Sequence, residues 1–272
     1  MNDRLRTLGR RVGFVLVAVV LVCLAIVVAG YVVGPNPGVQ SAPAVDVDEP
    51  PPEVVADATA QLWVRDHTWE QWTQERNLTT GAARGGIVAQ VRVQHSRKRV
   101  RVTQWDFLYE ENETVEPTDP PVYEGFSRRH AAWGSWTDED DWNRITGIEP
   151  VYGPRSSAPV YYNSQFRNAS MTVVSENESA LAVRTSDERA LEALEMSGAP
   201  GNVTVTFVVA KTENPYLSRV TVRHQRNESV DVNTYRVSAV GNTTAPKPDG
   251  VPAVTPVEVV RRTYFGVESL LG

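Results

Sequence analysis

The longest run of uncharged residues lies near the N-terminus, from Val12 to Gly34. As a helix rising about 1.5 Å per residue it would reach about 34 Å, enough to cross a hydrocarbon layer of about 30 Å. A secretory signal has a shorter apolar core and ends at a small-x-small cleavage site, which Ala29-Gly30-Tyr31 matches poorly. We therefore expect residues 12–34 to form a transmembrane helix that stays in the mature protein.

The only cysteine, Cys23, lies inside this run and directly follows Leu21 and Val22. Because a lipid-attachment site has small residues before its cysteine, we interpret Cys23 as an ordinary packing residue of the helix. Arg10 and Arg11 leave a twin-arginine export signal as the alternative, although the residues after them are less bulky than that signal prefers. A single cysteine also excludes a disulfide scaffold.

Charge predicts how the span is oriented. Ahead of it, Arg4, Arg6, Arg10 and Arg11 outweigh Asp3, and beyond it no basic residue occurs before Arg65. The positive-inside rule therefore makes residues 1–11 a cytoplasmic tail and places the main domain outside the cell. The chain has a net charge of -6. The part after the membrane is more acidic still, which argues against nucleic acid or an anionic lipid surface as its partner.

Acceptor triplets for N-linked glycans, Asn-x-Ser/Thr, are frequent after the apolar run. They begin at Asn77, Asn112, Asn168, Asn177, Asn202, Asn227 and Asn242. Any one triplet means little, but all of these fall on the side expected to be outside. They therefore predict a glycosylated surface domain.

Arginine greatly outnumbers lysine, which occurs only at Lys98, Lys211 and Lys247. Together with an excess of acidic over basic residues and a pI near 5.4, this composition is typical of a salt-adapted, GC-rich microbe. We therefore expect a haloarchaeal source.

The rest of the chain divides into a stalk and a domain. Residues 35–53 are rich in proline and acids without apolar periodicity, which predicts an extended stalk, and residues 54–272 would form the external domain. Apolar residues at helical intervals predict a first helix within residues 52–66. Residues 68–77 are open between helix and strand, because Trp69 and Trp72 are three apart while Thr and Trp favour strands.

Period-two alternation then predicts strands. Residues 87–94 and 100–104 alternate around a turn at Ser96-Arg97-Lys98, as in an antiparallel hairpin. Further strands are predicted at residues 170–176, 179–185, 202–212, 216–226 and 229–240, and short connections favour antiparallel pairing. A helix at residues 185–198 is predicted from a Thr185/Glu188 capping box and a stop at Gly198. For residues 112–166 we expect only short helices and loops.

This order of elements resembles the LolA-like superfamily of bacterial lipoprotein carriers and related archaeal surface lipoproteins. The resemblance spans residues 52–245 and rests on "DHTWEQWTQERN", "GIVAQVRVQHSRKRVRVTQW" and "VTFVVAKTENPYLSRVTVRHQRNESVDVNTYRV". It implies an α+β fold in which a curved antiparallel sheet, an incomplete barrel, packs on helices around an apolar cavity that holds acyl chains. The carriers are free shuttles with an arginine-proline pair after an early strand. This chain is expected to be tethered and lacks that pair, so neither role is carried over.

All the tryptophans lie before residue 143, so large apolar surface is concentrated in the first half of the domain. Packing of helices on the sheet explains this distribution, and an apolar pocket is the alternative. The residues expected to line such a pocket are Trp69, Trp72, Trp105, Phe107, Trp133 and Trp136.

Catalytic and metal-binding patterns are weak. The histidines are scattered, and no nucleophile elbow, phosphate loop or dinucleotide fingerprint occurs. The acidic run at residues 138–141 follows Thr137, which favours a helix start over a calcium site. We therefore expect no enzymatic activity, cofactor or metal.

The leading hypothesis is a membrane-anchored cell-surface binding module that holds a lipid or other apolar ligand. The alternative is a non-enzymatic structural or interaction domain of the cell envelope with a filled core and envelope proteins as partners. A surface enzyme is the third.

Overall fold

The computed structural model describes residues 41–105, 114–116, 119–128, 131–137, 141–145, 164–194 and 202–255. The predicted cytoplasmic tail, the transmembrane helix at residues 12–34 and the first residues of the stalk lie outside these ranges. Of the helices that are described, none has the length and apolar character needed to cross a membrane.

One antiparallel sheet dominates the described part of the chain. Its strands are β1 (His67–Asn77), β2 (Ala83–Gln94), β3 (Arg99–Gln104), β4 (Thr114–Val115), β5 (Tyr123–Arg128), β6 (Ala131–Trp136), β7 (Asn143–Ile145), β8 (Thr172–Glu176), β9 (Ala180–Thr185), β10 (Asn202–Ala210), β11 (Tyr216–Gln225) and β12 (Ser229–Ser238). They lie in the order β7-β6-β5-β3-β2-β1-β12-β11-β10-β9-β8, and β4 pairs with β2 in parallel. Since β7 and β8 end this order without pairing, the sheet is unclosed.

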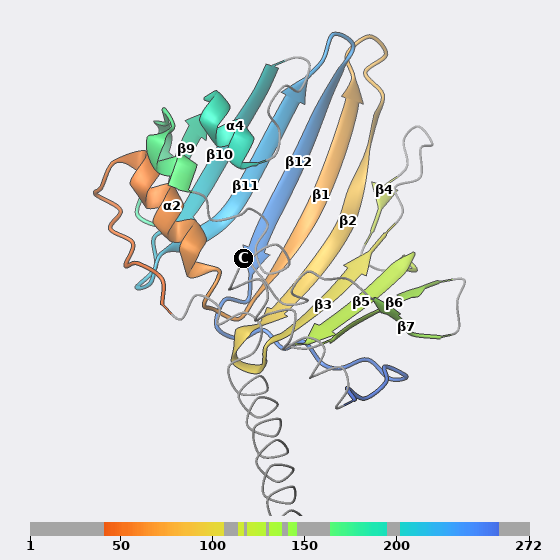
Figure 1. Ribbon diagram of the computed structural model, residues 1–272. Helices are drawn as coiled ribbons and strands as arrows, with labels where there is room; N and C mark the ends of the chain where they lie inside the picture. Colours follow the sequence, from red (N-terminus) through yellow and green to blue (C-terminus); the bar gives the residue numbers. More distant parts are fainter. Residues whose placement is uncertain are drawn as a thin grey trace, which may run out of the picture.

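Helices lie on one face of the sheet near its β8 edge. They are α2 (Pro51–Gln61), the short η2 (Ser164–Asn168) and α4 (Glu188–Ala193), while η1 (His95–Arg97) forms the turn between β2 and β3. Figure 1 shows α2 and α4 in front of β9, β10 and β11, with β12, β1 and β2 continuing beside them. The fold class expected from the sequence, a curved antiparallel sheet packed on helices, is therefore confirmed for the described residues.

Alternation along the strands gives the sheet two faces. Residues directly opposite on neighbouring strands share a face. The register therefore places Phe207, Val220, Tyr235, Trp69 and Val91 on the face that carries the helices, called here the helix face. The intervening residues, such as Thr221, Thr234 and Trp72, lie on the opposite, outer face. Opposite Gln71 and Trp72 the pairing of β1 with β2 shifts by one residue.

The main core lies between the helices and the helix face. Val54, Val55, Ala58 and Leu62, from α2 and the residue after it, pack with alternate residues of β9, β10 and β11, and Phe166 of η2 meets Phe207 edge to face at 5.5 Å. Val45 and Val47, from the stretch predicted as stalk, pack against the same core. Burying this stripe of α2 is what fixes the helix over the β8 side of the sheet.

The two ends of the strands are distinct. Where β1 begins, the Gln61 side chain donates to the Pro43 carbonyl oxygen at 2.6 Å and the Gly241 amide donates to Asp66 at 2.7 Å. We call this the tether end, because Pro43, close to the first described residue, lies here. At the far end, the Leu78 amide donates to the Glu228 carbonyl at 2.8 Å, which joins the β1–β2 turn to the β11–β12 turn.

Most elements predicted from alternation are confirmed, and residues 68–77 resolve as strand β1. Two predictions were wrong. Strands β4, β5, β6 and β7 lie in the section for which we expected only short helices and loops. The capping box at Thr185 does not form either, because Thr185 still pairs with Val205 as the last residue of β9, and Asp187 caps α4 by accepting from the Arg189 amide.

Candidate functional site

Near the tether end, the helix face remains apolar beyond the area that the helices cover. Val91, Val93 and Val100, from β2 and β3, form a second buried cluster, and each is 3% exposed or less. Trp69 packs against this cluster and also against the main core. It therefore joins two apolar regions into one surface that runs from β9 to β3.

Trp69 and Tyr235 form the centre of this surface. They lie on the neighbouring strands β1 and β12, and their rings are 6.1 Å apart. The indole N–H of Trp69 is buried and has no hydrogen-bond partner among the described residues. Burial also raises the pKa of Tyr235 above its ordinary value, so its hydroxyl stays neutral. The pair thus presents polar atoms, a donor and a hydroxyl, within an apolar environment.

Two buried histidines lie at the tether end of this surface. His67 begins β1 and His95 lies in η1, and their ring centroids are 6.3 Å apart. Desolvation by burial, with His67 as the next cause, lowers the pKa of His95 to about 4. Its Nε2 donates to the Leu62 carbonyl oxygen at 3.1 Å. A neutral ring held in this way serves packing rather than charge.

Tyr123 and Trp136 lie on the helix face near the β7 edge of the sheet, on β5 and β6, with ring centroids 4.9 Å apart. Gly125 and Gly134 are directly opposite each other beside them. A Cβ on Gly134 would come within 2.6 Å of the Tyr123 hydroxyl oxygen. The two glycines therefore make room for the Tyr123 ring.

The aromatic residues predicted to line a pocket are divided between the two faces. Trp69 and Trp136 lie on the helix face, and Trp136 is 52% exposed. Trp72 and Trp105 pack with Ile87 on the outer face, where Trp133 also stacks on Phe126 at 6.2 Å. Phe107 lies outside the described residues. The structure thus brings Trp72 and Trp105 together, and a lining role for any of them stays a prediction.

Most of the predicted glycan acceptors lie at the surface. Asn168, Asn177, Asn202, Asn227 and Asn242 are exposed, Asn77 is half-buried, and Asn112 lies outside the described residues. Asn77, Asn202 and Asn227 all lie at the far end of the sheet, as the pairs Asn77–Ser229 and Asn202–Gln225 show. The side-chain oxygens of Asn77 and Asn177 accept hydrogen bonds from the turns that follow them. Occupancy stays a prediction.

Within the described ranges, no group of three or more His, Cys, Asp or Glu side chains could hold a metal ion. Most of the acidic run, Asp138–Asp140, lies outside these ranges. The Thr137 hydroxyl donates to the Pro121 carbonyl oxygen and its amide donates to the Val122 carbonyl oxygen. The helix start expected after Thr137 falls on residues outside the described ranges and stays a prediction.

Sequence reasoning missed two groups of residues. Tyr235 and Tyr123 were not predicted, because the expected lining residues were tryptophans and Phe107 alone. The arginines of the outer face were also missed, although the alternation that predicted the strands, for example Arg219, Thr221 and Arg223 on β11, already placed them opposite the core.

No family model matches the chain, and no curated protein matches it. The chain is similar to several solved structures. The lipoprotein LppX of Mycobacterium tuberculosis matches at 10% identity with a TM-score of 0.38, covering 65% of this chain and 88% of that one. A DUF1329 family protein from Desulfovibrio piger matches at 10% identity with a TM-score of 0.29, covering 74% and 96%. A LolA superfamily protein from Nitrosomonas europaea matches at 9% identity with a TM-score of 0.26, covering 67% and 88%.

The resemblance to LolA-like proteins expected from the sequence is thus found among solved structures. The likeness concerns the fold alone. The haloarchaeal source stays a prediction from composition.

Proposed function

We propose that this chain is a non-enzymatic binding module that holds an apolar ligand, such as an acyl chain, against the helix face of its sheet. The proposal includes a single membrane span at residues 12–34, a cytoplasmic N-terminus and an extracellular domain. Its charge pattern and acceptor triplets support that arrangement. The ligand is expected to be a lipid or a lipid-modified molecule.

The observation that carries the proposal is the centre of the helix face. Helices cover the β9–β11 part of this face. Its half near the tether end stays apolar across β12, β1, β2 and β3, whereas Gln71, Asn233 and the Arg84–Glu75 pair make the half towards the far end polar. Trp69, Tyr235 and Val102 remain half-buried there, above valines that are fully buried. Half-buried aromatic and aliphatic side chains can bury further area against an acyl chain, at about 25 cal/mol per Å².

Trp69 supplies the polar contact that such a ligand needs. A buried donor without an acceptor costs about 1–3 kcal/mol, and among the described residues none accepts from the Trp69 indole N–H. A carboxyl or ester oxygen of a bound lipid would accept this hydrogen. Ligand pockets commonly combine an apolar lining with a few such polar groups, which fix orientation.

Native mass spectrometry of the full chain, extracted from its source membranes in mild detergent, tests the proposal. We expect a bound lipid that a fluorescent fatty acid displaces. Val102→Asn would put an amide on the helix face and weaken binding by about tenfold or more. Thr103→Asn, on the adjacent residue of the outer face, is the matched control and should leave binding unchanged. A chain that is always ligand-free and ignores fatty acids would exclude this function.

One observation favours the second candidate, a structural or interaction domain of the envelope with a filled core. Beneath α2, η2 and α4 the core is completely closed, since Val54, Val55, Phe166, Phe207 and Val209 have no exposed surface. Under this alternative, Val102→Asn would lower the free energy of unfolding without changing any ligand content.

A further inference from the structure

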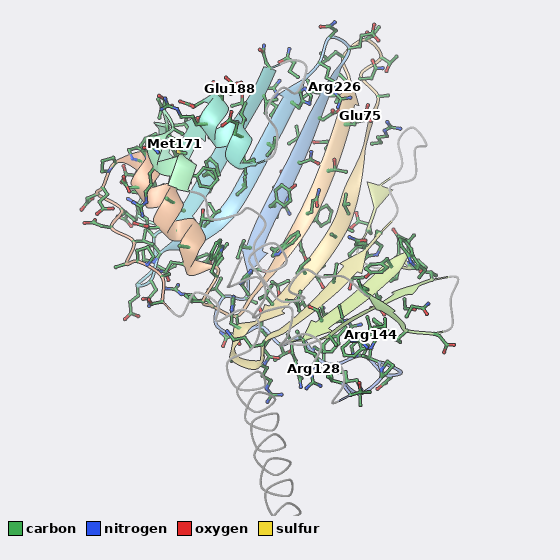
Figure 2. All side chains as sticks on the ribbon, in the orientation of Figure 1. Glu75, Arg128, Arg144, Met171, Glu188 and Arg226 are labelled. Carbon is green, nitrogen blue, oxygen red and sulfur yellow. The ribbon has the colours of Figure 1, made fainter. Side chains whose placement is uncertain are left out.

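The outer face of the sheet is strongly basic, although the chain as a whole is acidic. Strand register places the following arginines on it: Arg76, Arg92, Arg99, Arg101, Arg128, Arg144, Arg184, Arg219, Arg223 and Arg236. Among the described strands, the acidic residues on the same face are Glu70 and Glu124. Figure 2 labels Arg128 and Arg144 at the β5–β7 end of this array. The chain therefore has a cationic surface although its net charge is negative.

Several of these arginines lie directly opposite one another. The pairs are Arg219–Arg236 between β11 and β12, Arg92–Arg101 between β2 and β3, and Arg99–Arg128 between β3 and β5. Like charges directly opposite each other on neighbouring strands destabilise a sheet. These arginine pairs therefore do not stabilise the fold. An anion that bridges two guanidinium groups would relieve the repulsion between them.

The chain pairs its arginines elsewhere. Arg84 bonds Glu75 on the helix face, Arg167 bonds Asp57 and Glu53 beside α2, and Arg226 lies 3.2 Å from Asp231 at the far end. On the outer face, Arg101 has Glu124. Within the described residues, Arg184, Arg219 and Arg223 have no carboxylate partner, and all three are exposed. Their charge is therefore available to a partner molecule.

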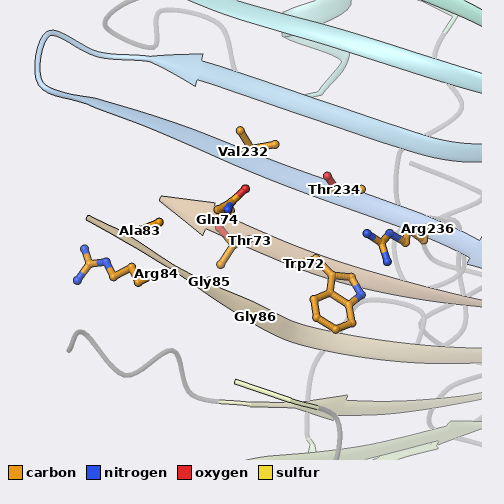
Figure 3. A pocket seen from close by; sticks show the side chains of 10 residues that line it. All are labelled: Trp72, Thr73, Gln74, Ala83, Arg84, Gly85, Gly86, Val232, Thr234 and Arg236. Carbon is orange, nitrogen blue, oxygen red and sulfur yellow. The ribbon is translucent and has the colours of Figure 1, made fainter. Parts of the chain in front are cut away.

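A shallow pocket of about 290 Å³ opens on this face between β12, β1 and β2. Figure 3 shows the indole of Trp72 and the guanidinium of Arg236 beside each other at one end, with Val232 and Thr234 along β12 and Gly85 and Gly86 along β2. The Arg236 guanidinium lies over the Trp72 ring, 5.4 Å from its centroid. This stacking restricts the arginine without neutralising its charge. Glu70 lies directly opposite Arg236, and its carboxylate accepts hydrogen bonds from the Trp72 indole and the Gln90 amide.

The lining of this pocket suits one kind of anionic unit. Trp72 and Val232 give apolar walls, Thr234 and Gln74 offer a hydroxyl and an amide, and Arg236 supplies the cation. A sugar ring has apolar C–H edges and hydroxyl groups, and a uronic acid adds a carboxylate. The volume is at the lower limit of small-molecule sites, about 300 Å³, which fits a short unit of a longer polymer.

The lining favours a sugar polymer over a lipid surface, because a hydroxyl, an amide and a guanidinium group lie beside the apolar wall of the pocket. The far end of the sheet carries the acceptors Asn77, Asn202 and Asn227. We infer that the outer face binds an acidic polysaccharide of the cell surface, with one acidic sugar in the Trp72–Arg236 pocket and further carboxylates or sulfates on Arg219, Arg223 and Arg184. This inference is independent of the apolar site on the helix face.

The test compares variants of the full chain, in detergent micelles, for binding to alginate, a polyuronate, by isothermal titration calorimetry. The double variant Arg219→Gln/Arg236→Gln should weaken binding by about tenfold or more, and raising the salt concentration should weaken binding of the parent chain. The matched control is Arg226→Gln, which removes an arginine of the far-end turn and should leave alginate binding unchanged.

Thermal unfolding separates loss of the site from loss of the fold. The double variant removes a like-charge pair and also the stacking of Arg236 on Trp72. These two effects oppose each other, so its midpoint of thermal unfolding should lie within about 3 °C of that of the parent chain. Displacement of a fluorescent fatty acid should be unaffected, which distinguishes this result from a failure of the apolar site.

Three outcomes would overturn the inference. The first is an equal loss in the Arg226→Gln control, which would mean that general charge suffices. The second is tighter binding to vesicles of phosphatidylglycerol and phosphatidylcholine in equal parts than to alginate. The third is tighter binding to polyglutamate or to a single-stranded DNA oligonucleotide than to alginate.

Discussion

The Nε2 atom of His95 donates a hydrogen bond to the backbone carbonyl of Leu62 at 3.1 Å and thereby ties the β2–β3 turn to the residue after α2. Burial, the neighbouring His67 and Lys98 lower the pKa of His95 to about 4, against smaller raising effects of Leu62 and Asp66. The unfolded chain therefore takes up a proton near pH 6.5, whereas the folded chain does so only near pH 4.

The free energy of unfolding should therefore decrease at acid pH. The contribution of neutral His95 is complete above about pH 6.5 and is lost as the pH falls towards 4, by up to about 3 kcal/mol. Urea unfolding of the full chain at a series of pH values, followed by tryptophan fluorescence, measures this slope. His95→Gln keeps a donor to Leu62 but cannot be protonated, so it should flatten the slope. An unchanged slope in that variant would assign the effect to other groups.

Arg167 should be important for the seating of α2. It bonds the carboxylates of Asp57 and Glu53 on that helix, and Asp57 is buried. Desolvation, followed by Glu49, raises the pKa of Asp57. Without Arg167 the buried carboxylate loses its counter-charge, so Arg167→Gln should lower the free energy of unfolding by about 2 kcal/mol.

The loss of unfolding free energy in Arg167→Gln should be greater at neutral pH than at about pH 4, where the Asp57 carboxylate is protonated more easily. In an Asp57→Asn background the same change should cost much less. Equal losses in the two backgrounds would show that the Arg167–Asp57 pair is not coupled.

Trp69 and Trp105 should respond differently to replacement by phenylalanine. The Trp105 indole donates to the Asp119 carbonyl oxygen at 2.8 Å, whereas the buried Trp69 indole has no acceptor in the part of the chain that the structure describes. Trp105→Phe removes a hydrogen bond and Trp69→Phe relieves an unsatisfied donor, so Trp105→Phe should be more destabilising, by about 1 kcal/mol. Chemical denaturation of ligand-free chains checks the order. The reverse order would mean that Trp69 has an acceptor in solution.

Gly134 should be intolerant of a side chain only while Tyr123 is present. A Cβ at this position would lie 2.6 Å from the Tyr123 hydroxyl oxygen and 2.7 Å from a ring carbon. Gly134→Ala should therefore lower the free energy of unfolding by about 1–3 kcal/mol. In a Tyr123→Ser background the alanine should be nearly neutral. Additive effects of the two changes would contradict the steric explanation.

Strand alternation was readable from the sequence wherever one face of a strand is buried. Residues 202–238 show it clearly, because Val205, Phe207 and Val220 lie against the helices while threonines and arginines alternate with them. Strand β1 was ambiguous because Trp69 and Trp72 are three residues apart. The structure places these two tryptophans on opposite faces, beside a shift in register that local sequence does not reveal.

Other features depended on contacts between distant residues. Strands β5 and β6 contain Gly125 and Gly134, which look like loop residues until they lie opposite each other beneath Tyr123. Thr185 satisfied a capping pattern, but pairing with Val205 kept it in a strand. The basic outer face was missed because a net charge averages over both faces of the sheet.

The unclosed sheet leaves β8 as an edge strand, with all of its residues exposed, including Val173 at 46% and Val174 at 42%. An apolar edge of this kind can pair with a strand of another molecule and start aggregation. Asn168 lies just before β8 and Asn177 just after it, so glycans at these two acceptors would flank the open edge. Glycans at both ends of β8 would therefore keep the edge strands of neighbouring copies from pairing, and so would oppose aggregation at the cell surface.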